Sequence, residues 1–431
     1  MKKDRATRRE ILKTAMAASA AIFPLPGFFP SPALAQSAKA RIVVIGGGFG
    51  GATCARALKR ADPKLAVTLV EPNRVYTACP MSNAAIAGLR ELTLQEFRYN
   101  RIAAEGIEIV YAPAETIESG AQAVTVGGGQ RLEYDRLVLA PGIDFLWDAL
   151  PGYSREAAAS MPHAWIGGDQ IALLTRQIAS MDDGGVVVIS VPVTPARCPP
   201  APYERASLIA HMLKTRKPRS KVIVLDAKDE FTMQRQFQAA WKQLYPGVLE
   251  YVSLSDGGVV TSVEAATRTV TTDFDKYTPA VANIIPRQIA GQLSGIAAVA
   301  DRTGWCPVDP ITFESRLRPN IHVIGDAAIA GAMPRSASAA ISQAKICAAA
   351  VATLLAGNTP PTPTLTSSCF SLVAPDYAIS QSGQYRPAGD LYTEVEGSAG
   401  ISAVDAPREL RAKEARDGEA WFFTTTTEVF G

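Results

Sequence analysis

Three of the six cysteines are each followed directly by a proline, at Cys79, Cys198 and Cys306. Proline disfavours helical geometry for the residue before it, so each of these thiols is expected in a turn. Two such thiols can form a disulfide, and a disulfide sulfur is an electrophile open to attack by a thiolate. The spacing along the chain does not say which of the three would pair. These turns are the first candidates for a site that handles sulfur and electrons.

The other cysteines and the histidines point to less chemistry. Cys54 and Cys347 fall in alanine-rich segments expected to be helical, where a thiol is most simply a buried packing residue, and the role of Cys369 stays open. The three histidines are scattered, which argues against a multi-histidine metal centre. His322 lies between apolar neighbours and is interpreted as a packed core residue. No Cys-x-x-Cys-His motif for haem attachment occurs, and no metal site is expected.

A glycine-rich turn near the start of the chain has the arrangement of a dinucleotide-binding fold. A β-branched run over 40–45 leads into Gly-Gly-Gly-Phe-Gly-Gly, then a helical segment over 52–61 and a second strand over 66–70. That order predicts a turn whose bare backbone approaches a pyrophosphate, with N–H donors from the helix N-terminus and a ribose-binding acid after the second strand. The predicted contacts are Gly46, Gly48, Phe49, Gly51 and Glu71.

Two later segments favour FAD over a nicotinamide dinucleotide at this turn. Residues 134–142 resemble the strand and turn that close the flavin domain in flavoproteins with two dinucleotide folds. Residues 320–327 resemble the late motif of the same superfamily, in which a Gly-Asp pair ends a strand and the carboxylate would hold the ribityl chain. The helix expected after Pro334 would point its positive N-terminal end at the flavin. The predicted contacts are Gly142, Gly325 and Asp326.

A second dinucleotide-type fold is expected in the middle of the chain, without its nucleotide-binding turn. Buried strands are predicted over 185–190 and 221–226. In a pyridine-nucleotide reductase the turn after the first of them would be rich in glycine. Here residues 191–200 contain several prolines and no glycine, and proline lacks an N–H group and crowds a bound phosphate. NAD(P)H is therefore not expected to bind there in the usual way.

Residues 1–35 have the pattern of an export signal. Basic residues precede an apolar stretch, Ala33-Leu34-Ala35 supplies a cleavage site, and residues 7–13 resemble the twin-arginine motif. An amphipathic tail or a membrane anchor is the alternative, although several prolines would break a spanning helix. We therefore expect a soluble periplasmic protein that is exported already folded, with no membrane span.

The composition is that of a chain with large cores. Of 431 residues, 47% are hydrophobic and 19% are charged, which excludes wholesale disorder. The 43 basic against 41 acidic residues are too evenly balanced for a general nucleic-acid binder. The predicted class is α/β, with two Rossmann-like dinucleotide-binding-type domains, as in FAD/NAD(P)-dependent disulfide reductases, and a small C-terminal domain. The expected parts are the signal at 1–35, an FAD-binding domain at 36–150 and 285–358, the second Rossmann-like domain at 151–284, and the C-terminal domain at 359–431.

Several segments give the chain a specific family resemblance. It resembles the flavoprotein subunit of flavocytochrome c sulfide dehydrogenase, including relatives in thiosulfate-oxidising (Sox) operons, through residues 76–79, 197–206 and 304–309. The resemblance covers essentially the whole mature chain and includes the tail segments 369–375 and 400–407. It implies that the C-terminal domain is of the flavocytochrome c type.

The resemblance implies a role for each site residue. Cys79 would hold FAD covalently, through a thioether to the 8α-methyl group of the flavin. Cys198 and Cys306 would form a redox-active disulfide beside the isoalloxazine. Hydrosulfide would attack Cys198 and release Cys306 as a thiolate, which passes two electrons to FAD and leaves sulfur or polysulfide. Glu204 would take the proton of the incoming sulfide if burial raises its pKa.

Plainer interpretations of the same residues stay open. Cys79 could be a structural thiol, and Cys198 with Cys306 an inert structural disulfide of the kind periplasmic proteins carry. Glu204 could be a solvated surface charge.

The expected electron acceptor is a separate c-type cytochrome subunit, since the chain has neither a haem motif nor a nicotinamide turn. The first alternative is a sulfide:quinone oxidoreductase, which would need a membrane-contacting surface, and residues 421–427 are apolar only briefly. The second is a non-catalytic flavin-binding accessory protein of a sulfur-oxidising complex.

Overall fold

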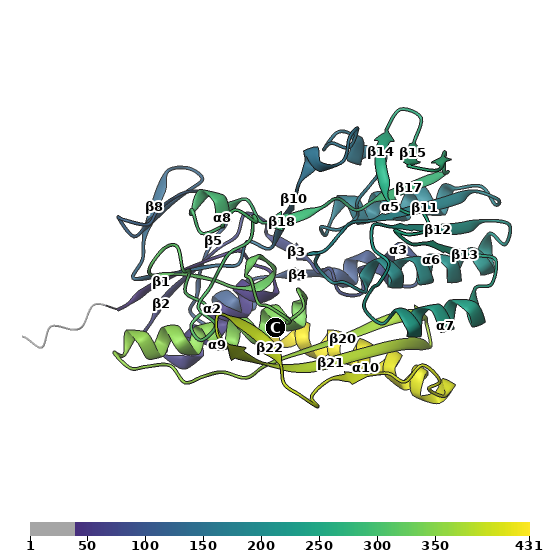
Figure 1. The fold of residues 1–431 in the computed structure, drawn as a ribbon. Helices are drawn as coiled ribbons and strands as arrows, with labels where there is room; N and C mark the ends of the chain where they lie inside the picture. Colours follow the sequence, from purple (N-terminus) through teal and green to yellow (C-terminus); the bar gives the residue numbers. More distant parts are fainter. Residues whose placement is uncertain (1–38) are drawn as a thin grey trace, which may run out of the picture. The chain divides into compact units, whose positions relative to one another are not determined.

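Two parallel β-sheets organise the part of the chain that the structure describes (Figure 1). The computed structural model describes residues 39–431, and Ala40–Gly431 form one unit. The export signal expected over 1–35 lies outside the described residues. The predicted α/β class with two dinucleotide-binding-type sheets is confirmed.

The first sheet has five parallel strands in the order β19-β9-β1-β2-β5. Their Val-, Ile- and Leu-rich cores are buried, as parallel sheets with both faces covered require. In that order the strands are Ile321–Val323, Arg136–Leu139, Arg41–Ile45, Ala66–Val70 and Glu108–Val110. The predicted strands at 40–45 and 66–70 are present, and β19 joins them from far along the chain.

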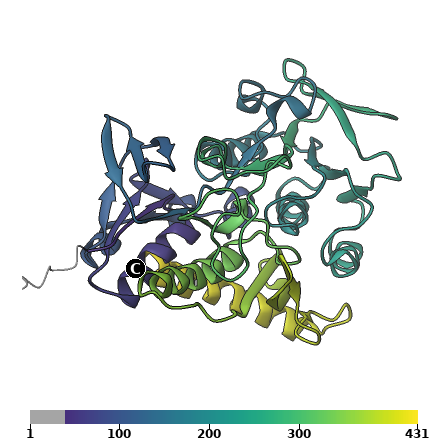
Figure 2. The ribbon, with the colours of Figure 1, turned by 60° about the vertical axis from the view of Figure 1, so that its left-hand side comes forward.

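Two long helices cover this sheet beside the glycine turn. Helix α2 (Phe49–Ala61) begins three residues before the predicted start at 52. Gly50 and Gly51 lie in its first turn, although glycine disfavours helix by propensity. Helix α9 (Ala337–Leu355) packs along α2, as the purple and green helices in Figure 1 and Figure 2 show. Among the described helices α9 alone is long and apolar enough to span a membrane, and half of its apolar stretch is buried inside the protein.

The second sheet is also parallel, in the order β13-β12-β11-β17. These strands are Leu249–Val252, Lys221–Asp226, Val186–Val191 and Val281–Ile284. Helix α6 (Ala201–Arg216) connects β11 to β12, and α5 (Asp169–Ser180) and α7 (Gln234–Leu244) complete this part. The turn between β11 and α6 carries the Cys198 motif.

Short elements join and decorate the two sheets. Strands β10 (Ile143–Phe145) and β18 (Gln288–Ala290) pair where the chain passes from the first sheet to the second and back. The remaining short strands are β3 (Val75–Thr77), β4 (Glu96–Arg98), β6 (Ala114–Glu118), β7 (Ala123–Val126), β8 (Gln130–Glu133), β14 (Val260–Glu264), β15 (Thr269–Thr272) and β16 (Lys276–Tyr277). The short helices are α3 (Ser82–Ile86), α4 (Asn100–Ala104) and α8 (Leu293–Ile296).

The C-terminal residues form an antiparallel sheet and a long helix. The elements are β20 (Leu365–Ala374), β21 (Tyr377–Ala388), β22 (Leu391–Glu394), β23 (Gly400–Ile401) and α10 (Arg408–Phe430). Strand β20 is an edge strand that packs against both α9 and α6. Its outward N–H groups are capped by side chains of those helices: Ser342 at Thr366, Ser338 at Ser368 and Glu204 at Leu372. These caps fix β20 between the two parallel sheets.

Candidate active site

One cavity of about 810 Å³ gathers most of the predicted site residues. It is lined by the glycine turn, by the Cys79 and Cys198 turns, by the N-terminus of α9 and by β20. The predicted residues in its wall are Gly46, Gly48, Phe49, Glu71, Cys79, Gly142, Cys198, Glu204, Gly325 and Asp326. Gly51 and Cys306 are not in that wall.

The glycine turn has the shape that a phosphate-binding loop requires. Gly46 has a φ of +103°, and a Cβ there would overlap the carbonyl oxygen of Ala140. A Cβ on Gly51 would overlap the carbonyl oxygen of Gly46, so this glycine lets α2 approach the turn. At Gly48 the nearest atom to an added Cβ is 3.5 Å away, so the protein leaves space in front of the helix N-terminus. That open approach is what a pyrophosphate needs.

The carboxylate of Glu71 braces this turn. Its Oε2 accepts a hydrogen bond of 2.8 Å from the backbone N–H of Gly47. Its Oε1 accepts bonds of 2.9 Å from both the backbone and the side-chain nitrogen of Asn73. Glu71 lies in the cavity wall directly after β2, at the position where a ribose-binding acid is expected.

Cys79 lies in a positively charged corner of the cavity. Its Sγ is 3.9 Å from the carbonyl oxygen of Trp165, which also accepts from the guanidinium of Arg197. The Arg197 guanidinium is 3.9 Å from the carboxylate of Asp326. Burial by itself would lower the pKa of Arg197, but Cys79 and Asp326 outweigh it and hold the pKa above its ordinary value.

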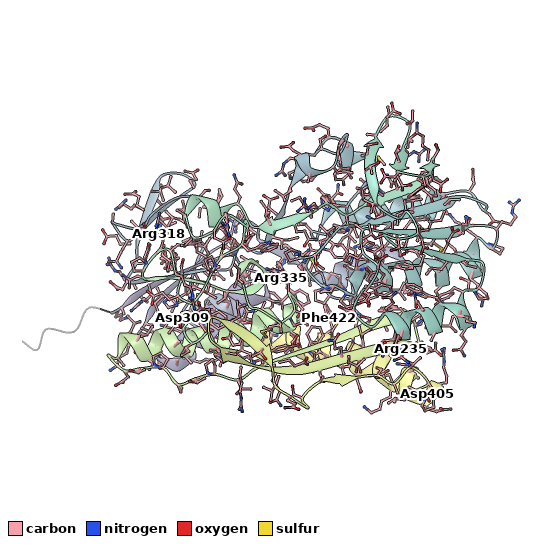
Figure 3. The ribbon with its side chains drawn as sticks, viewed as in Figure 1. Arg235, Asp309, Arg318, Arg335, Asp405 and Phe422 are labelled. Atoms are coloured by element: carbon pink, nitrogen blue, oxygen red, sulfur yellow. The ribbon has the colours of Figure 1, made fainter. Side chains whose placement is uncertain are left out.

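The backbone holds Cys198 in an uncommon conformation. Its φ is +50°, in the left-handed region that non-glycine residues rarely occupy. Its N–H donates to the carbonyl of Arg335 at 2.7 Å, and its carbonyl accepts from the N–H of Ala201, the first residue of α6, at 2.9 Å. Arg335, labelled in Figure 3, also donates from its Nε to the carbonyl of Asp326 at 2.9 Å. The Cys198 turn is thus tied to the segment that carries the predicted flavin contact.

The thiol beside Cys198 is Cys369 of β20, not Cys306. The hydrogen bond between the two thiols, together with burial, raises the pKa of Cys198 well above its ordinary value. Both line the cavity, and all six cysteines are free thiols in the described residues.

Cys306 is fully buried elsewhere, and burial raises its pKa to about 11. Its backbone bonds to Ala327 and Ile329. The structure therefore does not bring Cys198 and Cys306 together as a disulfide, because the Cys306 turn packs under the Gly325 segment.

Glu204 is buried beside the cysteine pair, and the alternative of a solvated surface charge is wrong. Its Oε2 accepts a 2.7 Å bond from the side chain of Asn83, and its Oε1 accepts a 2.9 Å bond from the N–H of Leu372. Burial raises the pKa of Glu204 to about 7, although these two bonds and Arg205 oppose the shift. A carboxyl with this pKa can accept and release a proton near neutral pH.

Arg205, the next residue on α6, organises the wall around Glu204. Its Nε donates to Asn83 Oδ1 at 3.0 Å, and its other nitrogens donate to Asn283 and to the carbonyls of His163 and Ala164. Burial lowers its pKa to about 9. Asn83 therefore donates to Glu204 while it accepts from Arg205, which fixes the orientation of its amide.

Sequence reasoning missed several of these residues. The sequence assigns no role to Cys369, or to Arg197 and Arg205, which lie within the segment 197–206. The spacing of Glu204 and Arg205 after Cys198, at the start of one helix, is the signal that could have placed both near the thiol. No local signal marks Cys369 or Asn83, because packing of β20 and α3 on α6 brings them in.

Two other predictions concern thiols and a histidine outside the cavity. Cys54 of α2 and Cys347 of α9 are fully buried, as predicted, and share a hydrogen bond. His322 is also fully buried, its Nδ1 lies 2.8 Å from the carbonyl of Thr312, and burial lowers its pKa to about 4. Within residues 39–431 no group of three or more His, Cys, Asp or Glu side chains could hold a metal ion.

The cavity fits FAD. The bare glycine turn and Glu71 suit a pyrophosphate and a ribose, and Gly325 and Asp326 lie where the ribityl chain is expected. Ser336 caps α9 with a 3.1 Å bond to the N–H of Ala339, and the residues beside it line the cavity, so the positive end of this helix faces the site.

Two segments of the chain match models of one protein family. The family described as "Sulfide dehydrogenase [flavocytochrome c] flavoprotein chain, central" matches residues 171–286, and "Flavocytochrome c sulphide dehydrogenase, flavin-binding" matches residues 361–430. The flavocytochrome c sulfide dehydrogenase flavoprotein chain of Chlorobaculum thiosulfatiphilum is 57% identical over 44 residues, which are 92% of that sequence and 10% of this chain. This chain belongs to the flavocytochrome c sulfide dehydrogenase flavoprotein family. The predicted family resemblance is confirmed.

The wider superfamily appears in the other similarities. The pyridine nucleotide-disulphide oxidoreductase family matches residues 40–165. Mouse mitochondrial sulfide:quinone oxidoreductase is 22% identical over 300 residues, 66% of this chain and 65% of that relative, so the match spans just under two thirds of its length. The crystal structure of sulfide:quinone oxidoreductase from Aquifex aeolicus has a TM-score of 0.68 at 17% identity and covers 90% of this chain and 92% of its own, which shows the shared fold. The chain thus has the fold of the pyridine nucleotide-disulphide oxidoreductases.

Proposed function

We propose that this protein oxidises sulfide with Cys198 and Cys369 as its redox-active pair and passes the electrons to a c-type cytochrome. The observation that carries the proposal is the placement of two neighbouring thiols and a carboxyl of pKa about 7 in the wall of one flavin-shaped cavity. A disulfide between those thiols is an electrophile toward hydrosulfide, and a nearby base can take the proton.

Cys198, Cys369 and Glu204 each have a separate role in the proposed reaction. Hydrosulfide attacks Cys198 in the disulfide form of the pair, a new S–S bond forms, and the bond to Cys369 breaks so that Cys369 leaves as a thiolate. Glu204 accepts the substrate proton, and Asn83 and the N–H of Leu372 hold its carboxyl in place. A second hydrosulfide then attacks the outer sulfur of the Cys198 persulfide and forms a new S–S bond with it, while Cys198 leaves as a thiolate. The two thiols then give up two electrons and reform the disulfide. FAD, when bound, accepts an electron pair and can release electrons one at a time to a cytochrome.

Cys79 is the proposed anchor of FAD, through the 8α thioether. It lies in the cavity wall, and its Sγ and the guanidinium of Arg197 both contact the carbonyl oxygen of Trp165.

Substitution of the cysteines tests the pairing. Under anaerobic conditions, sulfide-dependent flavin bleaching in Cys198→Ala and in Cys369→Ala is expected to slow by at least about a hundredfold. Cys306→Ala serves as the matched control and is expected to keep the rate within about twofold, since Cys306 lies outside the cavity. Loss of activity in Cys306→Ala with retention in Cys369→Ala would restore the pairing expected from sequence. If Cys198→Ala loses the bleaching activity but keeps the physiological role of the protein in the cell, the interpretation as a non-catalytic flavin-binding accessory protein is favoured.

The acceptor and the location complete the proposal. A heterodimer with a cytochrome subunit in the periplasm, reached by twin-arginine export, is supported by the family names and by the sequence of residues 1–35. The second candidate acceptor is a quinone, favoured by the similarity to sulfide:quinone oxidoreductases. Steady-state rates with a c-type cytochrome and with a soluble quinone decide between them, and preference for the quinone would overturn the cytochrome assignment. Fractionation of expressing cells tests the location.

A further inference from the structure

A second cavity, of about 310 Å³, shares a wall with the flavin cavity. Trp165, Arg197 and Cys198 line both cavities. Most of the rest of the second wall comes from the carboxyl ends of β11 and β12 and the segments that follow them, two neighbouring parallel strands, and Gln288 of β18 completes it. Ligands of open α/β sheets bind at that edge. Cys198 therefore stands between the flavin site and an edge where a second ligand can bind.

The size and the wall of this cavity exclude a dinucleotide and suit a small molecule. Its volume is at the low end of the range of about 300–1,000 Å³ that ligand pockets span. The turn after β11 offers prolines where a nucleotide site would offer glycine N–H groups. The wall also includes the side chains of Ala196, Phe231 and Thr232.

The polar groups of the wall favour an anion. Two cations line it, Arg197 and Lys228. The Lys228 ammonium is 2.6 Å from the buried carboxylate of Asp226, so part of its charge is already balanced. Two further groups are N–H donors, the indole nitrogen of Trp165 and the amide nitrogen of Gln288, both buried without a partner among residues 39–431. The acidic residue in the wall, Glu230, is exposed to solvent.

We propose that this cavity binds a small anionic sulfur nucleophile, a low-molecular-weight thiolate or sulfite, which takes the sulfane sulfur from Cys198. The inference rests on the proposed function, because it needs a persulfide on Cys198. The acceptor sulfur attacks the outer sulfur of that persulfide and a new S–S bond forms. The bond from the outer sulfur to Cys198 Sγ breaks, and its electron pair remains on Cys198 as a thiolate. No net electrons are exchanged, and the product leaves as a persulfide or, from sulfite, as thiosulfate.

The left-handed backbone of Cys198 supports two separate approaches. Its φ of +50° is held from both sides, by the N–H bond to Arg335 and by the carbonyl bond from Ala201. These two bonds fix the backbone of Cys198. Because Cys198 lies in the wall that the two cavities share, hydrosulfide can reach it from the flavin cavity and the acceptor can reach it from the second cavity. The acceptor then never has to pass the flavin.

Bulk added to the second cavity tests the proposal on the purified, FAD-loaded protein. Anaerobic turnover with sulfide and cytochrome c is measured against rising concentrations of cysteine or of sulfite, and the sulfur product is trapped. Ala196→Phe, which fills the cavity, is expected to raise the KM for the acceptor by at least about tenfold. Val193→Phe adds the same bulk to an exposed position of the same turn that does not line the cavity, and is expected to leave that KM within about twofold.

A charge change at the cavity gives an independent readout that a folding defect in Ala196→Phe cannot obscure. Glu230→Lys is expected to lower the KM for the anionic acceptor by about fivefold. A response to cysteine alone or to sulfite alone assigns the site to that acceptor. Turnover that is indifferent to both acceptors in the wild type, or an acceptor KM that neither Ala196→Phe nor Glu230→Lys changes, overturns the inference. Failure of sulfide to bleach the wild-type flavin in a single turnover, without any acceptor, is a different result and overturns the proposed function.

Discussion

At the residue scale, the buried carboxyl of Glu204 links activity to pH. With a pKa of about 7 it is a base only above neutral pH, so the rate of sulfide-dependent flavin bleaching is expected to fall as pH falls through about 7. Glu204→Gln keeps the shape of the side chain and removes the base. We expect a rate lower by about a hundredfold at pH 8, with a shallower pH profile that reflects the ionisation of the substrate alone. An unchanged profile in Glu204→Gln would show that another group takes the proton.

The same carboxyl weakens the fold as it ionises. Its folded pKa of about 7 is above the ordinary value of 4.5, so between these values the folded state binds more protons than the unfolded state. The stabilisation is fully present below the ordinary value and is lost as pH rises through the folded pKa, a change of about 3 kcal/mol at most. Glu204→Gln is therefore expected to be more stable than the wild type by about 2 kcal/mol at pH 8 and to differ little at pH 5.

Urea unfolding at the two pH values measures this difference. Glu230→Gln removes an exposed carboxyl and is the control, with a change within about 0.5 kcal/mol at both pH values. If Glu204→Gln were destabilised at pH 8, the bonds to Asn83 and Leu372 would matter more than the burial of the charge.

What the sequence could predict at this scale depended on how local the signal was. Gly46, Glu71 and Asp326 are set by a strand and the turn that follows it, and all three line the cavity as expected. The partner of Cys198 is set by packing between segments far apart in the chain, where Glu204 caps an edge N–H of β20. The Cys-Pro pattern of Cys306 is as clear locally as that of Cys198, so the pattern alone could not separate them.

At the element scale, the contact between α2 and the glycine turn depends on one missing side chain. A Cβ on Gly51 would overlap the carbonyl oxygen of Gly46, whereas a Cβ on Gly50 would have its nearest neighbours at 3.7 Å. Gly51→Ala is expected to destabilise the protein by about 3 kcal/mol and to empty the flavin site, because α2 must move away from the turn. Gly50→Ala, in the same helical turn, is expected to change stability by less than about 1 kcal/mol.

Flavin content per chain and the thermal midpoint of both variants measure this effect. Equal behaviour of the two alanine variants would mean that α2 can shift without cost. The start of α2 also shows why element boundaries differ from prediction: glycine propensity placed the helix start at residue 52, and tight packing on the sheet moves it to Phe49.

At the scale of the whole molecule, the cavity joins parts of the chain that sequence alone treats as separate domains. Its wall takes residues from the first sheet, from the Cys198 turn, from β20 and from α10, including Gly418 and Trp421. A cofactor that fills it contacts all of these parts at once, and binding to the folded state alone stabilises it by RT ln(1 + [L]/Kd). The flavin is therefore expected to hold the C-terminal elements against the rest of the described chain.

Cys79→Ser turns this expectation into a measurement. In the wild type the yellow chromophore should stay with the acid-denatured chain, and its mass should exceed that of the polypeptide by one FAD. In Cys79→Ser the flavin should be released by acid but still bind before denaturation, because the rest of the cavity is intact.

Dialysis of the Cys79→Ser variant to the apo form should then lower its free energy of unfolding by about 3 kcal/mol, the value for a ligand at a hundred times its Kd. It should also make α10 sensitive to protease, and added FAD should reverse both effects. Retention of flavin by acid-denatured Cys79→Ser would remove Cys79 as the anchor, and an apo form as stable as the holo form would show that the C-terminal elements pack without the cofactor.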